Sequence, residues 1–189
     1  MSTLVEITPH AFDIDLEIFY ATPKNFTGKP VYTQPRCFLH PDAVSHLRRA
    51  MAIADELGYR FKVWDGYRPL SVQKLFWDFC PDPTFISDPS KGGPHNRGIA
   101  VDLTLVDKGT GEELEMGTHF DDLSPKAYHT ASNISKEAKH NRMTLLGIMT
   151  ASGWDWFKNE WWHYQLFNPK QYPVIDETTL GFQLTNHAA

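Results

Sequence analysis

Two short segments of the chain carry side chains suited to binding a metal ion together. The first, HNRGIAVD, runs from His95 to Asp102, and the second, NEWWHYQLF, holds Glu160 and His163. Two imidazoles and one carboxylate form a ligand set that suits a four-coordinate zinc ion with one position open for water. Glu160 would be a fourth polar group that is not a ligand, placed to accept a proton as the water attacks a carbonyl carbon. The pattern therefore indicates a hydrolytic zinc centre.

The same residues also have an ordinary structural interpretation. His95 can be a surface histidine of a loop, Asp102 a strand residue that accepts backbone hydrogen bonds, and His163 a core histidine beside two tryptophans. Other histidines, among them His119 and His129, qualify as metal ligands by residue type. Spacing by itself leaves these alternatives open.

The elements around the two segments predict an α+β fold in a single domain spanning residues 1–189. Apolar residues at helical spacing predict helices over 41–57, 71–80 and 135–153, and alternation predicts strands over 59–64 and 99–106. Pro41 suits a first helical turn, Ser135 an N-cap and Gly58 a C-terminal cap. Helices against an antiparallel sheet fit this order better than repeated βαβ units. No repeat or low-complexity linker divides the chain.

Periodicity also predicts which way some side chains point. Asp102 belongs to the small, polar face of strand 99–106, opposite the apolar face of Ile99, Val101, Leu103 and Leu105. In a regular strand Glu160 and His163 would face opposite ways, so we expect a bend at Glu160 and a strand that begins at Trp161. Trp161, His163 and Gln165 would then share one face, with Trp162, Tyr164 and Leu166 in the core. The stripe expected to bury helix 71–80 is Val72, Leu75, Phe76 and Phe79.

Composition narrows the classes of partner and the compartment. The chain has 18 Lys and Arg against 23 Asp and Glu, a net charge of -5, so it lacks the basic surface that nucleic acids or anionic membranes require. No stretch approaches 18 apolar residues, and the first twenty residues do not resemble a secretory signal. Two cysteines set no disulfide framework and indicate free thiols. We therefore expect a cytoplasmic protein with no membrane or nucleic-acid partner.

The motifs taken together resemble a known family. GPHNRGIAVD and EWWHY match the paired metal signature, SxHxxGxAxD and ExxH, of the zinc D-alanyl-D-alanine metallopeptidases. YATPKNFTGKPV at 20–31, WDGYRP at 64–69 and MGTHFD at 116–121 extend the likeness to the D-Ala-D-Ala dipeptidases of the VanX type. The ordered motifs span residues 20–164. The resemblance implies the small α+β fold shared with the hedgehog signalling domain.

The resemblance also implies a role for each matched residue. His95, Asp102 and His163 would bind one zinc ion, and Glu160 would be the catalytic base and proton shuttle. Arg68 matches the arginine that holds the substrate carbonyl and the developing oxyanion, where a fixed guanidinium offers both charge and donors.

Two further positions concern the substrate's amino end. Asp121 and Tyr20 match positions near the substrate's free ammonium, which implies a dipeptide substrate with an unblocked amino terminus. Loop capping is the structural alternative for Asp121, and core packing is the alternative for Tyr20. The implied activity is hydrolysis of D-Ala-D-Ala or a close dipeptide, in recycling or removal of a cell-wall precursor.

One position departs from the family pattern. Gly93 stands where the family has a serine two residues before the first metal histidine, so a hydroxyl able to bind substrate is missing, and Pro94 stiffens the approach. We expect metal binding and peptide cleavage to survive this change, whereas the family's substrate affinity or stereochemical preference is less securely carried over to this chain. Two alternatives remain: a carboxypeptidase or endopeptidase acting on longer peptidoglycan stems, and a zinc-binding module without hydrolysis.

Overall fold

A five-stranded sheet lies at the centre of the computed structural model, which describes residues 4–185. Its strands lie in the order β2-β4-β5-β7-β6 and pair antiparallel, except for the parallel pair β2 and β4. A two-stranded sheet pairs β1 with β3. The strands are β1 (Val5–Ile7), β2 (Asp15–Leu16), β3 (Cys37–Leu39), β4 (Tyr59–Asp65), β5 (Ala100–Asp107), β6 (Asp155–Trp156) and β7 (His163–Gln165). The predicted α+β class is confirmed.

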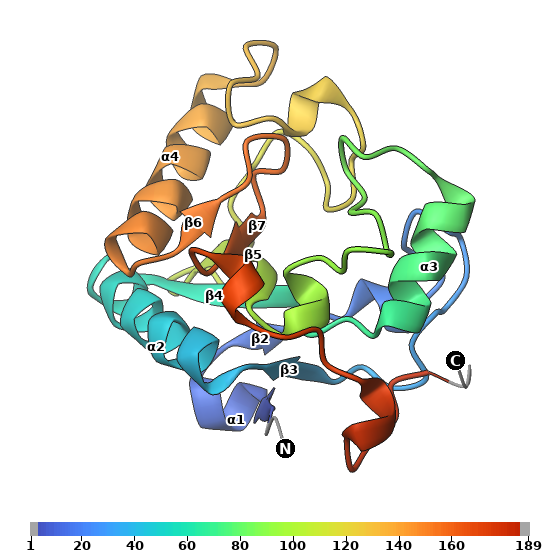
Figure 1. Cartoon of the computed structure of the whole chain (residues 1–189). Coiled ribbons are helices and arrows are strands. Elements are labelled where there is room, and N and C mark those ends of the chain that lie inside the picture. The colour runs from blue at the N-terminus through green and yellow to red at the C-terminus, as the bar shows by residue number, and fades with distance from the viewer. Residues whose placement is uncertain (1–3, 186–189) are drawn as a thin grey trace.

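The α-helices surround this sheet. They are α1 (Pro9–Phe12), α2 (Pro41–Glu56), α3 (Leu70–Phe79) and α4 (Lys136–Ala151). Helices α2 and α4 pack against each other along one side of the molecule, and α3 lies across from them (Figure 1). No helix within residues 4–185 is long and apolar enough to cross a membrane. Cys37 is buried, Cys80 is partly exposed, and both are free thiols.

The three long helices confirm the sequence predictions to within a few residues at each end. Pro41 occupies the first turn of α2, and Gly58, just past its end, has the left-handed φ of 83° that glycine adopts without strain. Ser135 caps α4, where its side chain accepts a hydrogen bond of 2.9 Å from the Ala138 backbone N–H.

The buried face of α3 differs from the predicted one. Phe79 is 57% exposed, so its place on the buried stripe was predicted wrongly. It is the last residue of the helix and makes an edge contact with Phe26. Gln73 is buried instead, because its amide oxygen accepts from Arg68 and its amide nitrogen donates to the Ser87 carbonyl. Hydrogen bonds thus bury a polar side chain that hydrophobic periodicity cannot detect.

Strand β5 occupies the middle of the large sheet and is buried on both faces. Its register places Asp102 opposite His163 of β7 and, after an irregularity between Val63 and Asp65, opposite Asp65 of β4. Residues directly opposite each other in a sheet point to the same face with their Cβ atoms about 5 Å apart. The sheet alone therefore brings Asp102, Asp65 and His163 together.

The bend at Glu160 is present, but the strand starts later than predicted. Strand β7 begins at His163, and both preceding tryptophans lie in a turn. The Trp161 backbone N–H donates to the Ala127 carbonyl, and its indole packs edge-on against Trp64. Trp162, rather than Trp161, lines the same cavity as His163. The prediction that Trp161 shares a face with His163 is therefore wrong, because strand alternation does not continue through a turn.

Candidate metal centre

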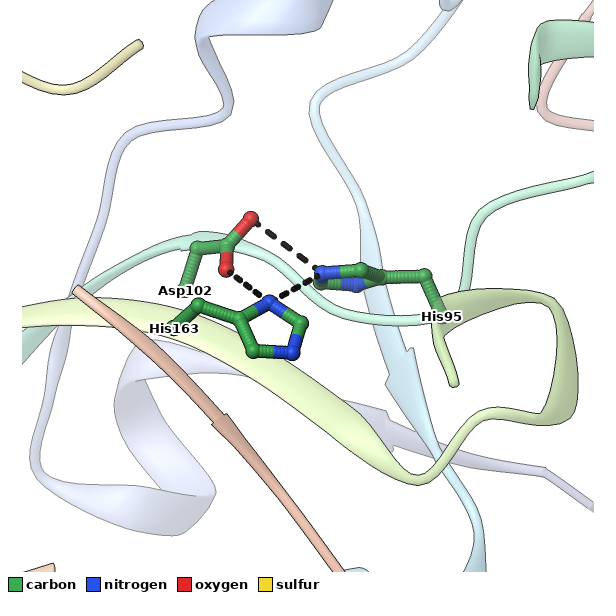
Figure 2. A group of neighbouring side chains, drawn as sticks. All are labelled: His95, Asp102 and His163. Atoms are coloured by element: carbon green, nitrogen blue, oxygen red, sulfur yellow. Dashed lines mark hydrogen bonds and ion pairs between the residues drawn. The ribbon is translucent and has the colours of Figure 1, made fainter. Parts of the chain in front are cut away.

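Three buried side chains from three segments converge at one point. His95 Nε2 lies 3.1 Å from His163 Nδ1 and 3.4 Å from Asp102 Oδ2, and His163 Nδ1 lies 3.1 Å from Asp102 Oδ1. Figure 2 shows the two imidazoles and the carboxylate turned toward one another. They are the only group of three or more potential metal ligands found within residues 4–185. The structure thus brings together all three residues that the sequence proposed.

The hydrogen bonds behind the two imidazoles fix which nitrogen carries a proton. His95 Nδ1 lies 2.7 Å from the Gly66 carbonyl oxygen, which can only accept, so Nδ1 is the donor and Nε2 keeps its lone pair. His163 Nε2 lies 3.1 Å from Gln165 Oε1, so its Nδ1 lone pair likewise faces inward. Such partners are the usual way of orienting metal-binding histidines.

This donor set fits a divalent cation. When both imidazoles are neutral, their two inward nitrogen lone pairs and the carboxylate face one another, and a positive charge between them relieves the repulsion. Ligand atoms about 2.0–2.1 Å from a tetrahedral zinc lie about 3.3 Å from each other. The 3.1 Å between the two imidazole nitrogens agrees with that spacing, and Asp102 presents one oxygen at 3.4 Å from His95 Nε2 and the other at 3.1 Å from His163 Nδ1. His95, Asp102 and His163 are therefore suited to hold zinc or a similar ion.

The position of His95 depends on the segment that follows β4. A Cβ atom at Gly66 would lie 2.7 Å from both the Phe38 carbonyl oxygen and the Cys37 sulfur. Only glycine lets the backbone pass this close to β3. The Gly66 carbonyl can then reach His95, whose own backbone carbonyl accepts a hydrogen bond from the Arg68 N–H.

Glu160 lies at the edge of the cluster without being one of its three members. It is buried, and its Oε2 atom lies 3.9 Å from His163 Nδ1. Burial raises the pKa of Glu160 to about 7, although the charges of His163 and Arg68 act in the opposite direction and Asp102 adds to the rise. A carboxyl group with a pKa near neutrality can both accept and release a proton, as a general base and acid must.

Arg68 is held rigidly beside the cluster. Its Nε donates to Asp65 Oδ2 at 2.9 Å, its Nη1 donates to Gln73, and its Nη2 lies 3.6 Å from Asp102 Oδ2. The guanidinium also packs against the rings of Tyr20 and Phe76. Its Nη2 also lies 2.9 Å from Asp65 Oδ2, so the second N–H of Nη1 is the donor that these contacts leave for a ligand in the cavity.

Asp65 is a site residue that sequence reasoning missed. It is buried, binds Arg68, and accepts a hydrogen bond of 3.0 Å from the Tyr32 hydroxyl. Its signal was present in the motif WDGYRP, three residues before Arg68. The family resemblance assigns a role within this motif to Arg68 alone, so the carboxylate that orients the arginine is not predicted.

Asp121 and Tyr20 form a second polar pair in the same cavity. The Tyr20 hydroxyl donates to Asp121 Oδ1 at 3.0 Å, whereas the buried Oδ2 atom has no hydrogen-bond partner within residues 4–185. Burial raises the pKa of Asp121 well above its usual value, and Arg68 partly offsets this. An ammonium group in the cavity would satisfy the free oxygen and favour the ionised carboxylate.

The histidines named as alternative ligands lie elsewhere. His119 is exposed in a separate groove that Glu17 and Lys24 also line. His129 packs edge-on against Trp156, and burial lowers its pKa to about 4. Neither residue belongs to the three-residue group.

Comparison with known proteins places these features in a family. The family described as D-ala-D-ala dipeptidase matches residues 2–184 of the chain. A D-alanyl-D-alanine dipeptidase of Escherichia coli (strain K12) is 37% identical over 91% of this chain and 89% of its own length. Proteins of the same name from Enterococcus faecalis (strain ATCC 700802 / V583) and Enterococcus faecium are 37% and 36% identical, over 82% and 78% of this chain and 86% and 83% of their own.

Removing one member of the three-residue cluster should remove the metal. We predict that His163→Ala purified from zinc-containing medium loses most of its bound metal, because two remaining ligands hold zinc poorly. His129→Ala and His119→Ala serve as controls and should keep the metal content of the unaltered protein. Elemental analysis of the purified proteins checks this. Full zinc occupancy in His163→Ala would mean that another residue completes the site.

Proposed function

Because this chain belongs to the D-Ala-D-Ala dipeptidase family of peptidases, we propose that it hydrolyses D-Ala-D-Ala or a closely related dipeptide with the aid of one zinc ion. The observation that carries the proposal is the convergence of His95, Asp102 and His163 beside Glu160 and Arg68. All five line one cavity. Peptide hydrolysis requires an activated water, a proton carrier and a donor to the carbonyl oxygen.

The two histidines and Asp102 would hold the ion. When bound, zinc lowers the pKa of a water molecule and polarises a carbonyl group. The protein keeps the ligands in place through the Gly66 carbonyl and the Gln165 side chain, so each imidazole presents its unprotonated nitrogen. The carboxylate of Asp102 adds negative charge and reduces the net charge of the loaded site.

Glu160 would move the proton. Its buried carboxylate lies next to the ligand His163 and faces the cavity, where it can accept a proton from the attacking water. With its pKa near 7 the same group can then donate that proton to the amine that leaves when the peptide bond breaks. One residue thus acts as base and then as acid.

Arg68 and Asp121 would orient the substrate around this proton transfer. The charged guanidinium of Arg68, with one N–H of Nη1 left for a ligand, suits the carbonyl oxygen, where negative charge grows during attack. Its rigid support avoids a cost of reorganisation. The unpartnered Oδ2 of Asp121 suits the dipeptide's ammonium group. With its ammonium group at Asp121 and its carbonyl oxygen at Arg68, the dipeptide would be held with its peptide bond facing the cluster.

Two alternatives fit the site less well. A carboxypeptidase or endopeptidase for longer peptidoglycan stems would place an amide where Asp121 presents a buried, unpartnered carboxylate oxygen. A zinc-binding module without hydrolysis has no use for the raised pKa of Glu160 or the fixed donors of Arg68. The free thiols of Cys37 and Cys80 favour a cytoplasmic enzyme that acts on cell-wall precursor dipeptides.

Glu160→Gln tests the proton carrier. The variant should keep its metal, because Glu160 is not one of the three ligands, and should lose about 10²–10⁴ in kcat, the usual contribution of a general base. D-Ala-D-Ala turnover and metal content measured on the same preparation separate the two effects. Turnover close to that of the unaltered enzyme would refute the role assigned to Glu160.

Blocking the substrate's amino group tests the role of Asp121. We expect N-acetyl-D-Ala-D-Ala to be hydrolysed at less than about a hundredth of the rate of D-Ala-D-Ala, because it leaves the buried carboxylate without a charged partner. A panel of D,D-, L,D- and L,L-dipeptides under the same conditions serves as the reference. Equal hydrolysis of the acetylated substrate would favour an enzyme that acts on longer chains.

A further inference from the structure

The missing side chain at Gly93 leaves room for another residue of the cavity wall. An ideal Cβ at Gly93 would lie 3.0 Å from Ser87 Oγ and 3.1 Å from Ser87 Cβ, closer than an ordinary van der Waals contact. Gly93 is not in the left-handed φ region, so the backbone does not require glycine there. The Ser87 side chain therefore occupies the space that a side chain at position 93 would need.

Both positions are fixed to the same arginine of the site. The Ser87 carbonyl accepts from Gln73, whose amide oxygen in turn accepts from Arg68 Nη1. The Gly93 N–H donates to Asn96 Oδ1 at 2.7 Å, and Asn96 Nδ2 donates to the Arg68 carbonyl at 2.8 Å. The close approach of Ser87 to Gly93 is thus part of the structure that holds Arg68.

The Ser87 hydroxyl is available to a ligand. Ser87 lines the cavity together with Arg68, His95 and Glu160, and its hydroxyl makes no hydrogen bond with another residue in 4–185. A free hydroxyl can donate one hydrogen bond and accept others. The Ser87 hydroxyl oxygen lies 3.0 Å from the position of a Cβ at residue 93, close to where the hydroxyl of a serine at that position would lie.

We propose that Ser87 supplies the substrate-binding hydroxyl that Gly93 lacks, and that it donates a hydrogen bond to the carboxylate of the dipeptide. The inference rests on the proposed function. Tyr20 binds Asp121 and packs its ring on the Arg68 guanidinium, whereas Ser87 is connected to Arg68 Nη1 through Gln73, so the two groups approach Arg68 through different contacts. With the ammonium at Asp121 and the scissile carbonyl at Arg68, the terminal carboxylate extends toward Ser87.

Moving the hydroxyl between the two positions tests this assignment. Ser87→Ala should raise the KM for D-Ala-D-Ala about tenfold with little change in kcat, because one hydrogen bond to a charged group is lost. The double variant Ser87→Gly with Gly93→Ser returns a hydroxyl to the same space and should bring KM back to within about threefold of the unaltered enzyme. The matched control, Ser87→Gly with Gly93→Ala, fills the space without a hydroxyl and should keep the raised KM.

Two further measurements sharpen the test. Ser90→Ala alters a serine of the same loop, bonded to Asp88 and outside the cavity lining, and should leave KM unchanged. With D-alanyl-D-alaninamide, Ser87→Ala should raise KM less than with the free acid, because an uncharged acceptor forms a weaker hydrogen bond.

The possible results separate this inference from the proposed function. An unchanged KM in Ser87→Ala, or equal KM values for the two double variants, would overturn the role of Ser87 while leaving the dipeptidase proposal intact. Equal effects on the acid and the amide would overturn the contact with the carboxylate. An unaltered enzyme that hydrolyses no dipeptide would overturn the proposed function and this inference with it.

Discussion

The pairing of Asp102 with His163 across β5 and β7 is the constraint on which the site depends. Sheet register places the two residues opposite each other, and a shift of one residue would turn one of them to the other face. The same register sets Asp65 of β4 on the other side of Asp102. Three strands that are far apart in the sequence therefore place two metal-ligand candidates, Asp102 and His163, next to Asp65, the carboxylate that orients Arg68.

The site buries more carboxyl groups than cationic side chains. Asp65, Asp102 and Glu160 are buried beside one buried arginine, and the partly buried Asp121 adds a fourth carboxyl group. Burial raises the pKa of Asp65, Glu160 and Asp121, which shows the cost of placing several acids around a single guanidinium. A divalent ion between the histidines and an ammonium beside Asp121 would supply the missing positive charge. The cavity thus suits a cation and a cationic substrate together.

Local patterns in the sequence were enough to predict the three long helices and the strands β4 and β5, but not the short helix α1. Pro41, Gly58 and Ser135 mark helix ends through local chemistry, and the spacing of His95, Asp102 and His163 correctly suggested that they meet. What depends on contacts between distant segments was not predictable. The turn before β7 is fixed by the Ala127 carbonyl, so the orientations of Trp161 and Trp162 could not be derived from strand alternation. Asp65 is also paired with Asp102 across the sheet and bonded to the Tyr32 hydroxyl. Ser87 is bonded to Gln73 of α3, so the places of both residues depend on other segments.

The most direct test of the account is the position of the bound ion. A crystal structure of the zinc-loaded enzyme, with anomalous diffraction measured on both sides of the zinc absorption edge, locates the metal without assumptions about the ligands. We predict one zinc ion about 2.0–2.2 Å from His95 Nε2, His163 Nδ1 and an oxygen of Asp102. Zinc bound at other side chains, with these three left uncoordinated, would contradict the account.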